Sequence, residues 1–168
     1  PLCFAAGAAY GKTFYVFGGR KNTDGGMVNS LWRYTSLKGW EVLQDTMPFA
    51  AREKYGCVLK DRSIFLFGGE RDDISLADAC MYDIAADTFA FPAPMNRART
   101  AFACGVSGDF IYVAGGMAED EETGSSVEFF DPSSGKWFVC EDVPDLRVSE
   151  TASLSYRDHL FLLGGNLS

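Results

Sequence analysis

Short apolar runs that end in a pair of glycines recur four times along the 168-residue chain. Each run contains aromatic residues and is too short for a typical helix, which predicts a buried strand. Two glycines directly after such a run predict a tight backbone turn. The runs occupy residues 13–17, 63–67, 110–114 and 160–163, and they end in Gly18-Gly19, Gly68-Gly69, Gly115-Gly116 and Gly164-Gly165.

The spacing of the glycine pairs indicates the size of the repeating unit. The pairs lie 50, 47 and 49 residues apart. A period near 50 is typical of one four-stranded blade per repeat. We therefore predict an all-β array of antiparallel blades that forms a single partial domain over residues 1–168. Its repeats are expected at approximately 1–49, 50–96, 97–144 and 145–168, and the last one is only half a blade.

Other residues recur in phase with the glycines. Each complete repeat has an aromatic residue in its third strand and another aromatic six or seven residues later: Tyr34 and Trp40, Tyr82 and Phe89, Phe130 and Trp137. An arginine then precedes the next glycine pair by 16, 16 and 17 residues: Arg52, Arg99 and Arg147.

This order of residues resembles the kelch motif, in which a glycine doublet, a spaced Tyr and Trp, and an Arg mark each blade. The resemblance covers essentially all 168 residues. It implies a partial kelch β-propeller of about three and a half blades, whereas propellers close with roughly four to eight blades. We therefore expect a piece of a larger propeller rather than a dimer that closes on itself.

The apolar pattern also predicts the individual strands, named A to D from the propeller axis outward. The first blade is expected at 3–9, 13–17, 30–34 and 40–44, and the second at 54–60, 63–67, 78–83 and 88–92. The third blade is expected at 100–106, 110–114, 126–130 and 136–140, and an A–B hairpin at 151–163.

Composition narrows the class of protein. The chain is 47% hydrophobic and 23% charged and carries a net charge of −8, which argues against general binding of nucleic acid or anionic membranes. Its five cysteines are odd in number and show no CxxC spacing, so they predict buried thiols in a reducing compartment. This favours a cytoplasmic or nuclear location.

Catalytic chemistry has little support in the sequence. His159 is the only histidine, so the copper and iron sites of other kelch-like propellers cannot be built here from their usual ligands. The glycine pairs are not followed by the helix that a phosphate-binding loop requires. We predict no catalytic, cofactor or metal residues. The alternative is a propeller enzyme whose active site lies in other blades.

The repeated residues divide into structural and candidate binding groups. The glycine pairs predict positive φ or close backbone approach. Tyr34, Trp40, Tyr82 and Trp137 are expected to pack between blades with their polar tips hydrogen-bonded, and Phe130 is a structural residue of the same motif. The resemblance implies that arginines at the D-to-A crossovers can bind acidic groups of a peptide ligand, although they can equally tie blade to blade. The candidate partner-binding residues are Arg20, Ser30, Arg52, Asp78, Arg99, Ser126 and Arg147.

Two features of the sequence differ from the family pattern and change the charge expected on this binding face. Asp78 stands where the family usually has serine, and an acidic run occupies residues 119–122 in the third blade. The run fits either a solvated loop or a site for a basic partner. We therefore expect a polarised face, with acidic ligand groups near the first two blades and basic groups near the third.

The resemblance implies a non-enzymatic protein-interaction domain that recruits a protein or peptide through its B–C and D–A loops. Related propellers serve as substrate receptors of ubiquitin ligases when joined to an F-box or BTB domain. Residues 98–106 look like a repeat of plant F-box–kelch proteins. A cytoskeletal kelch scaffold is a variant of the same interpretation.

Overall fold

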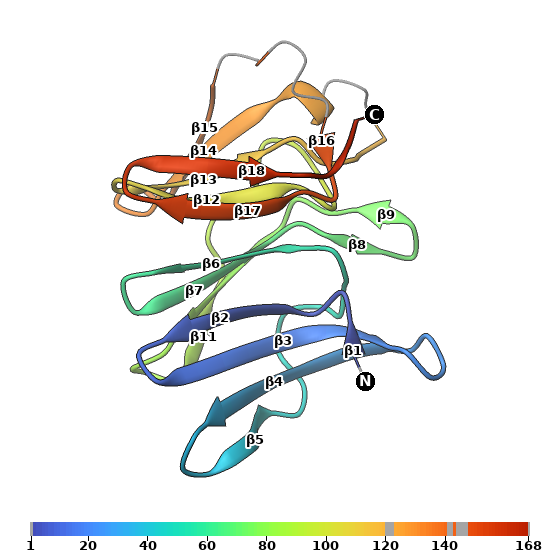
Figure 1. Cartoon of the computed structure of the whole chain (residues 1–168), viewed down its shortest axis with the longest axis vertical. Coiled ribbons are helices and arrows are strands. Elements are labelled where there is room, and N and C mark those ends of the chain that lie inside the picture. The colour runs from blue at the N-terminus through green and yellow to red at the C-terminus, as the bar shows by residue number, and fades with distance from the viewer. Residues whose placement is uncertain (1, 120–122, 141–142, 144–147, 168) are drawn as a thin grey trace.

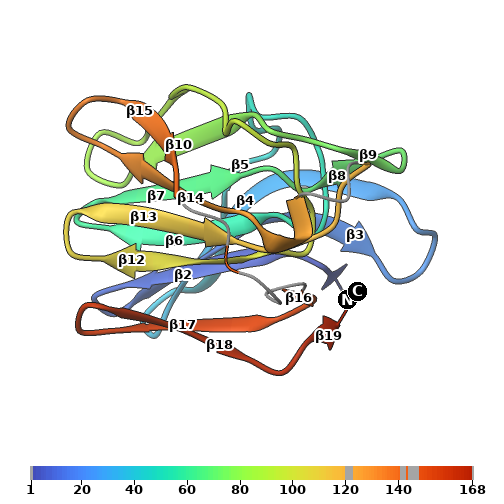
Figure 2. The same ribbon diagram turned by 90° about the horizontal axis from the view of Figure 1, so that it is seen from above.

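The computed structural model describes residues 2–119, 123–140, 143 and 148–167, which form an all-β fold with one 3₁₀ turn. One five-stranded and two four-stranded antiparallel sheets are stacked face to face like blades, with a further hairpin beside the third (Figure 1). This confirms the prediction of a partial propeller. Figure 2 shows the A–B and C–D turns along one side and the B–C loops along the other, here called the turn face and the loop face.

In blade one the strands follow each other in space in chain order. Strand A is β2 (Ala6–Tyr10), B is β3 (Thr13–Lys21), C is β4 (Met27–Thr35) and D is β5 (Gly39–Gln44). A short strand, β1 (Leu2–Cys3), pairs with the end of β3.

The other blades repeat this order. Blade two consists of β6 (Gly56–Lys60), β7 (Ser63–Phe67), β10 (Ala79–Asp83) and β11 (Thr88–Ala90), and its B–C loop carries the small hairpin β8 (Glu70–Arg71) and β9 (Ile74–Ser75). Blade three consists of β12 (Ala103–Ser107), β13 (Phe110–Ala114), β14 (Val127–Asp131) and β15 (Lys136–Val139), with the 3₁₀ turn η1 (Thr123–Ser125) in its B–C loop. The last hairpin is β17 (Ala152–Tyr156) and β18 (His159–Leu163), flanked by β16 (Val148–Ser149) and β19 (Asn166–Leu167).

The A strands begin later than predicted, for one repeated physical reason. A residue with positive φ precedes each of them: Phe4 (54°), Lys54 (53°), Ala101 (54°) and Glu150 (54°). A left-handed residue cannot continue an extended strand. The expected strand over 3–9 is therefore broken into β1 and β2, and the other three A strands begin at Gly56, Ala103 and Ala152.

Other predicted boundaries were also wrong, among them the start of strand C in blade one, which is Met27 rather than residue 30. Strand D of blade two ends at Ala90 rather than residue 92, because Pro92 lacks the N–H that a continued ladder would use. In blade one the glycine pair does not end strand B. Gly19 pairs with Val28, and the register shifts between Phe17 and Gly19 in a β-bulge, so β3 continues to Lys21.

The glycine pairs themselves behave as predicted, since all eight residues have positive φ. A Cβ atom on Gly68 would lie 2.6 Å from the Arg99 carbonyl oxygen, and one on Gly116 would lie 2.8 Å from that of Thr100. In blades two and three the second glycine of the pair also donates a hydrogen bond to the next crossover: Gly69 to Arg99 O at 2.9 Å and Gly116 to Val148 O at 2.8 Å. Glycine is therefore required for both the backbone conformation and the close contact.

Two apolar clusters fill the spaces between consecutive blades. Blade one contributes Phe17 and Leu31 to the first cluster, where they meet Leu66 and Tyr82 of blade two. In the second cluster Phe67 of blade two packs with residues of blade three, including Ile111, Val113 and Phe130. All of these side chains are buried, so the clusters join the blades into one body.

The repeated aromatic pairs have nearly the same geometry in every blade. The two rings face each other across strands C and D, with centroids 5.2 Å apart for Tyr34 and Trp40, 5.0 Å for Tyr82 and Phe89, and 5.3 Å for Phe130 and Trp137. In blades two and three the strand-C ring of this pair is buried against the preceding blade.

The first pair departs from the prediction of packing between blades. Tyr34 is 40% exposed and Trp40 is 54% exposed, because no other blade of the described residues lies against that face of blade one (Figure 1). Tyr82 and Trp137 fit the prediction. The Tyr82 hydroxyl donates to Asp87 at 2.7 Å, and the Trp137 indole donates to the Ala93 carbonyl at 2.9 Å.

Replacing Gly68 with alanine tests the close contact between a glycine turn and the next crossover. Gly108 has nearly the same φ (57° against 56°) but no atom within 4 Å of its Cβ position. We expect Gly108→Ala to lower the free energy of unfolding by about 1 kcal/mol, from backbone conformation alone. Gly68→Ala should cost about 1–3 kcal/mol more because of the added overlap. Urea denaturation of both variants measures the difference, and equal losses would contradict the contact.

Candidate partner-binding face

Arg52 lies in the crossover that enters blade two and is only 3% exposed. Its guanidinium donates to the Gly68 carbonyl at 3.0 Å and to the Asp78 carboxylate at 2.7 Å. It also stacks over the Phe49 ring, 3.5 Å from the centroid. These contacts fix the crossover to the glycine turn of the blade that follows it.

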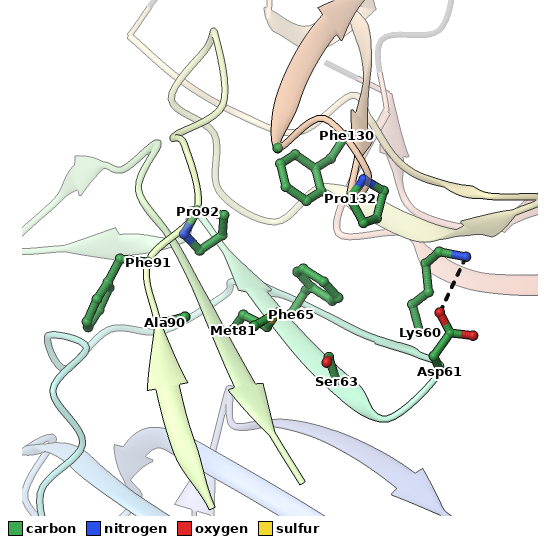
Figure 3. Close-up of a pocket in the computed structure, with 11 residues that line it drawn as sticks. Lys60, Asp61, Ser63, Phe65, Met81, Ala90, Phe91, Pro92, Phe130 and Pro132 are labelled. Carbon is green, nitrogen blue, oxygen red and sulfur yellow. Dashed lines mark ion pairs between the residues drawn. The ribbon is translucent and has the colours of Figure 1, made fainter. Parts of the chain in front are cut away.

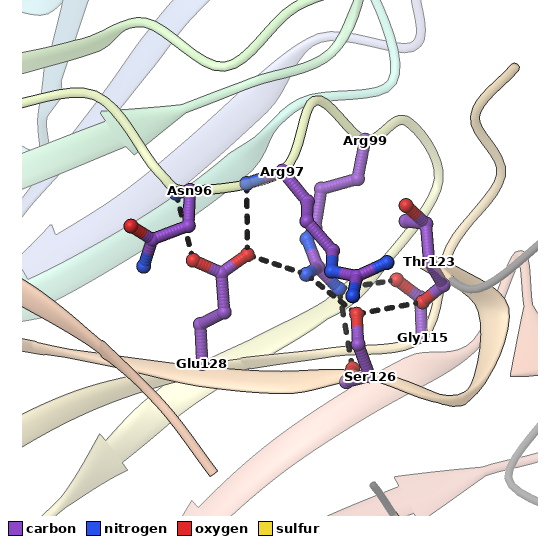
Figure 4. Close-up of polar contacts among 7 residues, drawn as sticks. All are labelled: Asn96, Arg97, Arg99, Gly115, Thr123, Ser126 and Glu128. Carbon is purple, nitrogen blue, oxygen red and sulfur yellow. Dashed lines mark hydrogen bonds and ion pairs between the residues drawn. The ribbon is translucent and has the colours of Figure 1, made fainter. Parts of the chain in front are cut away.

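Arg99 repeats this arrangement in blade three and is fully buried (Figure 4). Its guanidinium donates to the Gly115 carbonyl at 2.8 Å, to the Ser126 hydroxyl at 2.9 Å and to the Glu128 carboxylate at 2.7 Å. The ion pair compensates two charges that are both removed from water.

Glu128 is a residue that sequence reasoning missed. Besides Arg99, its carboxylate accepts the backbone N–H groups of Asn96 at 2.7 Å and Arg97 at 3.1 Å (Figure 4). A signal was available, because Glu128 lies two residues before Phe130 in strand C. Alternation places the two side chains on the same, buried face. An acidic residue at that position indicates a buried partner.

The contacts of Arg52 and Arg99 support the blade-tie interpretation that the sequence left open. Both guanidinium groups are buried and hold carboxylates of their own chain, so neither is displayed to a ligand. The third candidate of this kind, Arg147, lies outside the described residues.

The polar residues before the strand-C aromatics have different environments. Ser126 is buried with Arg99, and Asp78 keeps 54% of its side chain exposed while it pairs with Arg52. Ser30 accepts a hydrogen bond from the Trp32 indole at 2.7 Å. It has no arginine partner of this type because Leu2 stands 16 residues before Gly18.

Arg20 joins blade one to the next crossover at the surface. Its guanidinium grips the Glu53 carboxylate through two hydrogen bonds, of 2.8 and 2.5 Å. The hydrogen bond with Glu53 raises the pKa of Arg20. The Arg20 side chain remains 38% exposed, so among the described arginines predicted to bind a partner it is the most accessible.

The four left-handed residues before the A strands converge on a cavity of about 360 Å³, here called the inner cavity. It is lined by Phe4, Lys54, Tyr55, Ala101, Phe102, Glu150 and Thr151. Each left-handed residue precedes its glycine pair by 14 positions, and sequence reasoning missed them. Their residue types do not favour positive φ, so the regular spacing was the sole signal.

Backbone hydrogen bonds connect these left-handed residues from blade to blade. The Ala101 N–H donates to the Lys54 carbonyl at 2.9 Å, and the Glu150 N–H donates to the Ala101 carbonyl at 2.8 Å. Non-glycine residues with positive φ persist only where the surrounding structure holds them, and they concentrate at functional sites. The inner cavity is thus built by the same contacts that align the blades.

The charges around the inner cavity are largely paired. The Lys54 ammonium lies 2.6 Å from a Glu70 carboxylate oxygen, and this hydrogen bond raises the pKa of Lys54. Burial raises the pKa of Tyr55, whose hydroxyl therefore stays protonated and donates to the Phe17 carbonyl at 2.5 Å. The cavity thus combines aromatic surface with a neutralised cation and the Glu150 carboxylate.

Within the described ranges, no three His, Cys, Asp or Glu side chains are placed to hold a metal ion. His159 is exposed and stacks against Phe161, with ring centroids 6.0 Å apart. No helix in the described part of the chain is long and apolar enough to cross a membrane.

Comparison with known proteins gives one family. The model of the KLHDC2/KLHL20/DRC7 Kelch-repeats domain matches residues 4–167. Kelch-like protein 40 of Mus musculus is 31% identical over 170 residues, covering 98% of this chain and 26% of that protein. Kelch repeat protein M-T9 of myxoma virus is 31% identical over 120 residues, covering 70% of this chain and 23% of that protein.

An F-box/kelch-repeat protein of Arabidopsis thaliana is 28% identical over 123 residues, covering 71% of this chain and 32% of that protein. The chain therefore spans between 23% and 32% of the length of these three relatives.

Removing the Arg99 guanidinium tests the blade-tie role. Arg99→Ala leaves the buried Glu128 carboxylate without its cation, so we expect a loss of about 3–5 kcal/mol in the free energy of unfolding. Adding Glu128→Gln should recover part of it, because that charge is then absent. Arg33→Ala is the control at the ion pair with Glu41, whose two side chains are 32% and 31% exposed, and should cost much less. Urea denaturation that gives equal losses for Arg33→Ala and Arg99→Ala would exclude a special role for the buried pair.

Proposed function

Because the chain belongs to the kelch-repeat domain family, we propose that it is a non-enzymatic protein-interaction module that holds a partner on its loop face. The matched family model extends over residues 4–167, so the family assignment applies to nearly the whole chain. The partner is a protein or peptide, and its contact surface comprises the crossovers, the B–C loops and the inner cavity.

The observation that carries this proposal is the convergence of Phe4, Lys54, Ala101 and Glu150 at the inner cavity. These residues come from four repeats, share one backbone conformation and differ in chemistry. A repeated backbone site with variable side chains is suited to recognition, because the scaffold stays constant while the residue at each position sets specificity. An apolar side chain of the partner fits between Phe4 and Phe102.

Charge on the loop face favours a partner with cationic groups. The charges of Arg52, Arg99 and Arg20 are each compensated by a carboxylate of the same chain. In the β8–β9 hairpin the exposed Asp72 and Asp73 outnumber the exposed Arg71. We therefore propose basic partner groups beside blade two as well as blade three, in place of the acidic groups expected from the arginines.

We further propose that this recruitment serves a ubiquitin ligase, with the kelch domain as substrate receptor. The support is the similarity to an F-box/kelch-repeat protein, which extends over 71% of this chain. The five free thiols are consistent with a reducing compartment, and we propose the cytoplasm or nucleus.

Selection of peptides from a random display library on the 168-residue chain tests the interaction role. We expect a recurring motif with an apolar residue and basic neighbours. Ala101→Phe should weaken its binding at least about tenfold, or 1.4 kcal/mol, by filling the inner cavity. Phenylalanine is compatible with this backbone, since Phe4 has the same φ of 54°. Failure to enrich any motif, or unchanged affinity for Ala101→Phe, would contradict the proposal.

A further inference from the structure

A second concave site lies on the turn face between blades two and three, opposite the loop face. A cavity of about 360 Å³ opens there, and its lining is mainly apolar (Figure 3). An adjoining cavity of about 440 Å³ shares Lys60, Asp61 and Pro132 with it. We call the two together the turn-face groove. The apolar part is lined principally by Phe65, Met81, Ala90, Phe91, Pro92 and Phe130.

The groove arises from residue differences between repeats, as the corresponding place between blades one and two shows. There, Arg33 and Glu41 face each other across strands C and D and form an ion pair at 3.0 Å. Between blades two and three the same cross-strand position holds Met81 and Ala90. Replacing a long salt-bridged pair by a methionine and an alanine leaves the space open.

The polar groups beside that ion pair are also missing from the groove. Around Tyr15 the charges of Arg33 and Asp87 act on the phenol, whose pKa is raised mainly by burial. Phe65 replaces Tyr15 in the next blade, and Gly135 replaces Asp87 in the C–D turn. The floor of the groove is therefore formed by aromatic rings without hydroxyl groups, and Phe65 and Phe130 are 4% and 2% exposed.

The adjoining cavity adds negative charge next to this apolar floor. Three carboxylates line it, those of Asp61, Asp109 and Asp131, against the single ammonium of Lys60. That ammonium lies 3.9 Å from the Asp61 carboxylate. Hydrogen bonds from the Ser133 and Ser134 hydroxyls lower the pKa of Asp131, so this carboxylate stays charged at neutral pH.

We propose that the turn-face groove binds a short segment of a partner protein in which an aromatic side chain is followed by a basic one. The aromatic ring packs against the half-buried Met81, Pro92 and Pro132, above the Phe65 and Phe130 rings, and the cation lies beside Asp109 and Asp131. Pockets of about 300 Å³ and more accommodate such groups, and the three carboxylates select a cation over an anion. This site is independent of the loop face, so one module could hold two proteins at once.

Titration of the 168-residue chain with two blocked dipeptides tests both parts of the groove. Acetyl-Trp-Lys-amide should bind about threefold to fivefold more tightly than acetyl-Trp-Glu-amide, the difference expected of an exposed charge contact. Chemical-shift changes should centre on Phe65, Met81 and Phe130. Tryptamine, which has the ring and the cation but no peptide group, should bind more weakly than the lysine dipeptide.

Two variants separate the apolar floor from the charges. Met81→Arg with Ala90→Glu copies the Arg33–Glu41 pair into the groove, and it should abolish binding of both dipeptides. Asp109→Asn with Asp131→Asn should keep tryptophan binding but remove the preference for lysine. Ala101→Phe, on the loop face, should change neither affinity.

The proposal fails if the variant with Met81→Arg and Ala90→Glu, here called the filled variant, binds both dipeptides as the unmodified chain does. The aromatic ring of the dipeptide would then lie elsewhere. Equal affinity for the two dipeptides would overturn the charge selection, and equal affinity for tryptamine would point to a small amine rather than a partner segment. Should the filled variant lose the native spectrum, Ala90→Leu fills the cavity without new charges, and the same outcomes apply.

Discussion

The contact on which this structure depends is the one between each glycine turn and the crossovers around it. An arginine 16 residues earlier donates to the carbonyl of the first glycine, in blade two (Arg52 to Gly68) and in blade three (Arg99 to Gly115). In these two turns the second glycine donates to the crossover entering the following blade. The turns of blades two and three are therefore held from two sides, by the chain that enters their own blade and by the chain that enters the next.

The crossovers also shape the loop face. In blades two and three the residue two positions after the arginine, Lys54 or Ala101, has a left-handed conformation and lines the inner cavity. Phe4 and Glu150 adopt the same conformation without an arginine two residues earlier. The same anchoring neutralises the arginines. Residues that a partner could have recognised as free cations are used to hold the fold, whereas the left-handed positions beside them keep variable side chains. The division explains how one scaffold can remain constant while its ligand changes.

Much of the fold could be predicted from the sequence, because the same motif recurs with nearly the same spacing in each repeat. The glycine pairs, the aromatic pairs and the order of strands all follow from spacing and apolar pattern. The starts of the A strands could not be predicted, since Phe4, Lys54, Ala101 and Glu150 are held in the left-handed region by tertiary contacts and not by their residue type. The exposed state of Tyr34 and Trp40 was missed because equal motifs were assumed to have equal neighbours.

The candidate site was less predictable than the fold. Sequence position alone gave the arginines two roles, and the choice between them required Asp78 and the buried Glu128. In blade two the arginine pairs with Asp78, which occupies the position of the family serine, whereas in blade three it pairs with Glu128, two residues after that position. A motif aligned on the serine does not reveal this difference. The turn-face groove was missed as well, because it comes from differences between repeats rather than from what they share.

Amide hydrogen exchange measured residue by residue tests the central claim most directly, namely that the glycine turns and crossovers form one interlocked body. The account predicts that the amides of Gly69, Gly116, Ala101 and Glu150 exchange as slowly as those of the central strand β13, since each donates to a neighbouring blade or crossover. Gly108, in the exposed A–B turn between β12 and β13, should exchange quickly. Exchange of the four amides at the rate of Gly108 would contradict the account.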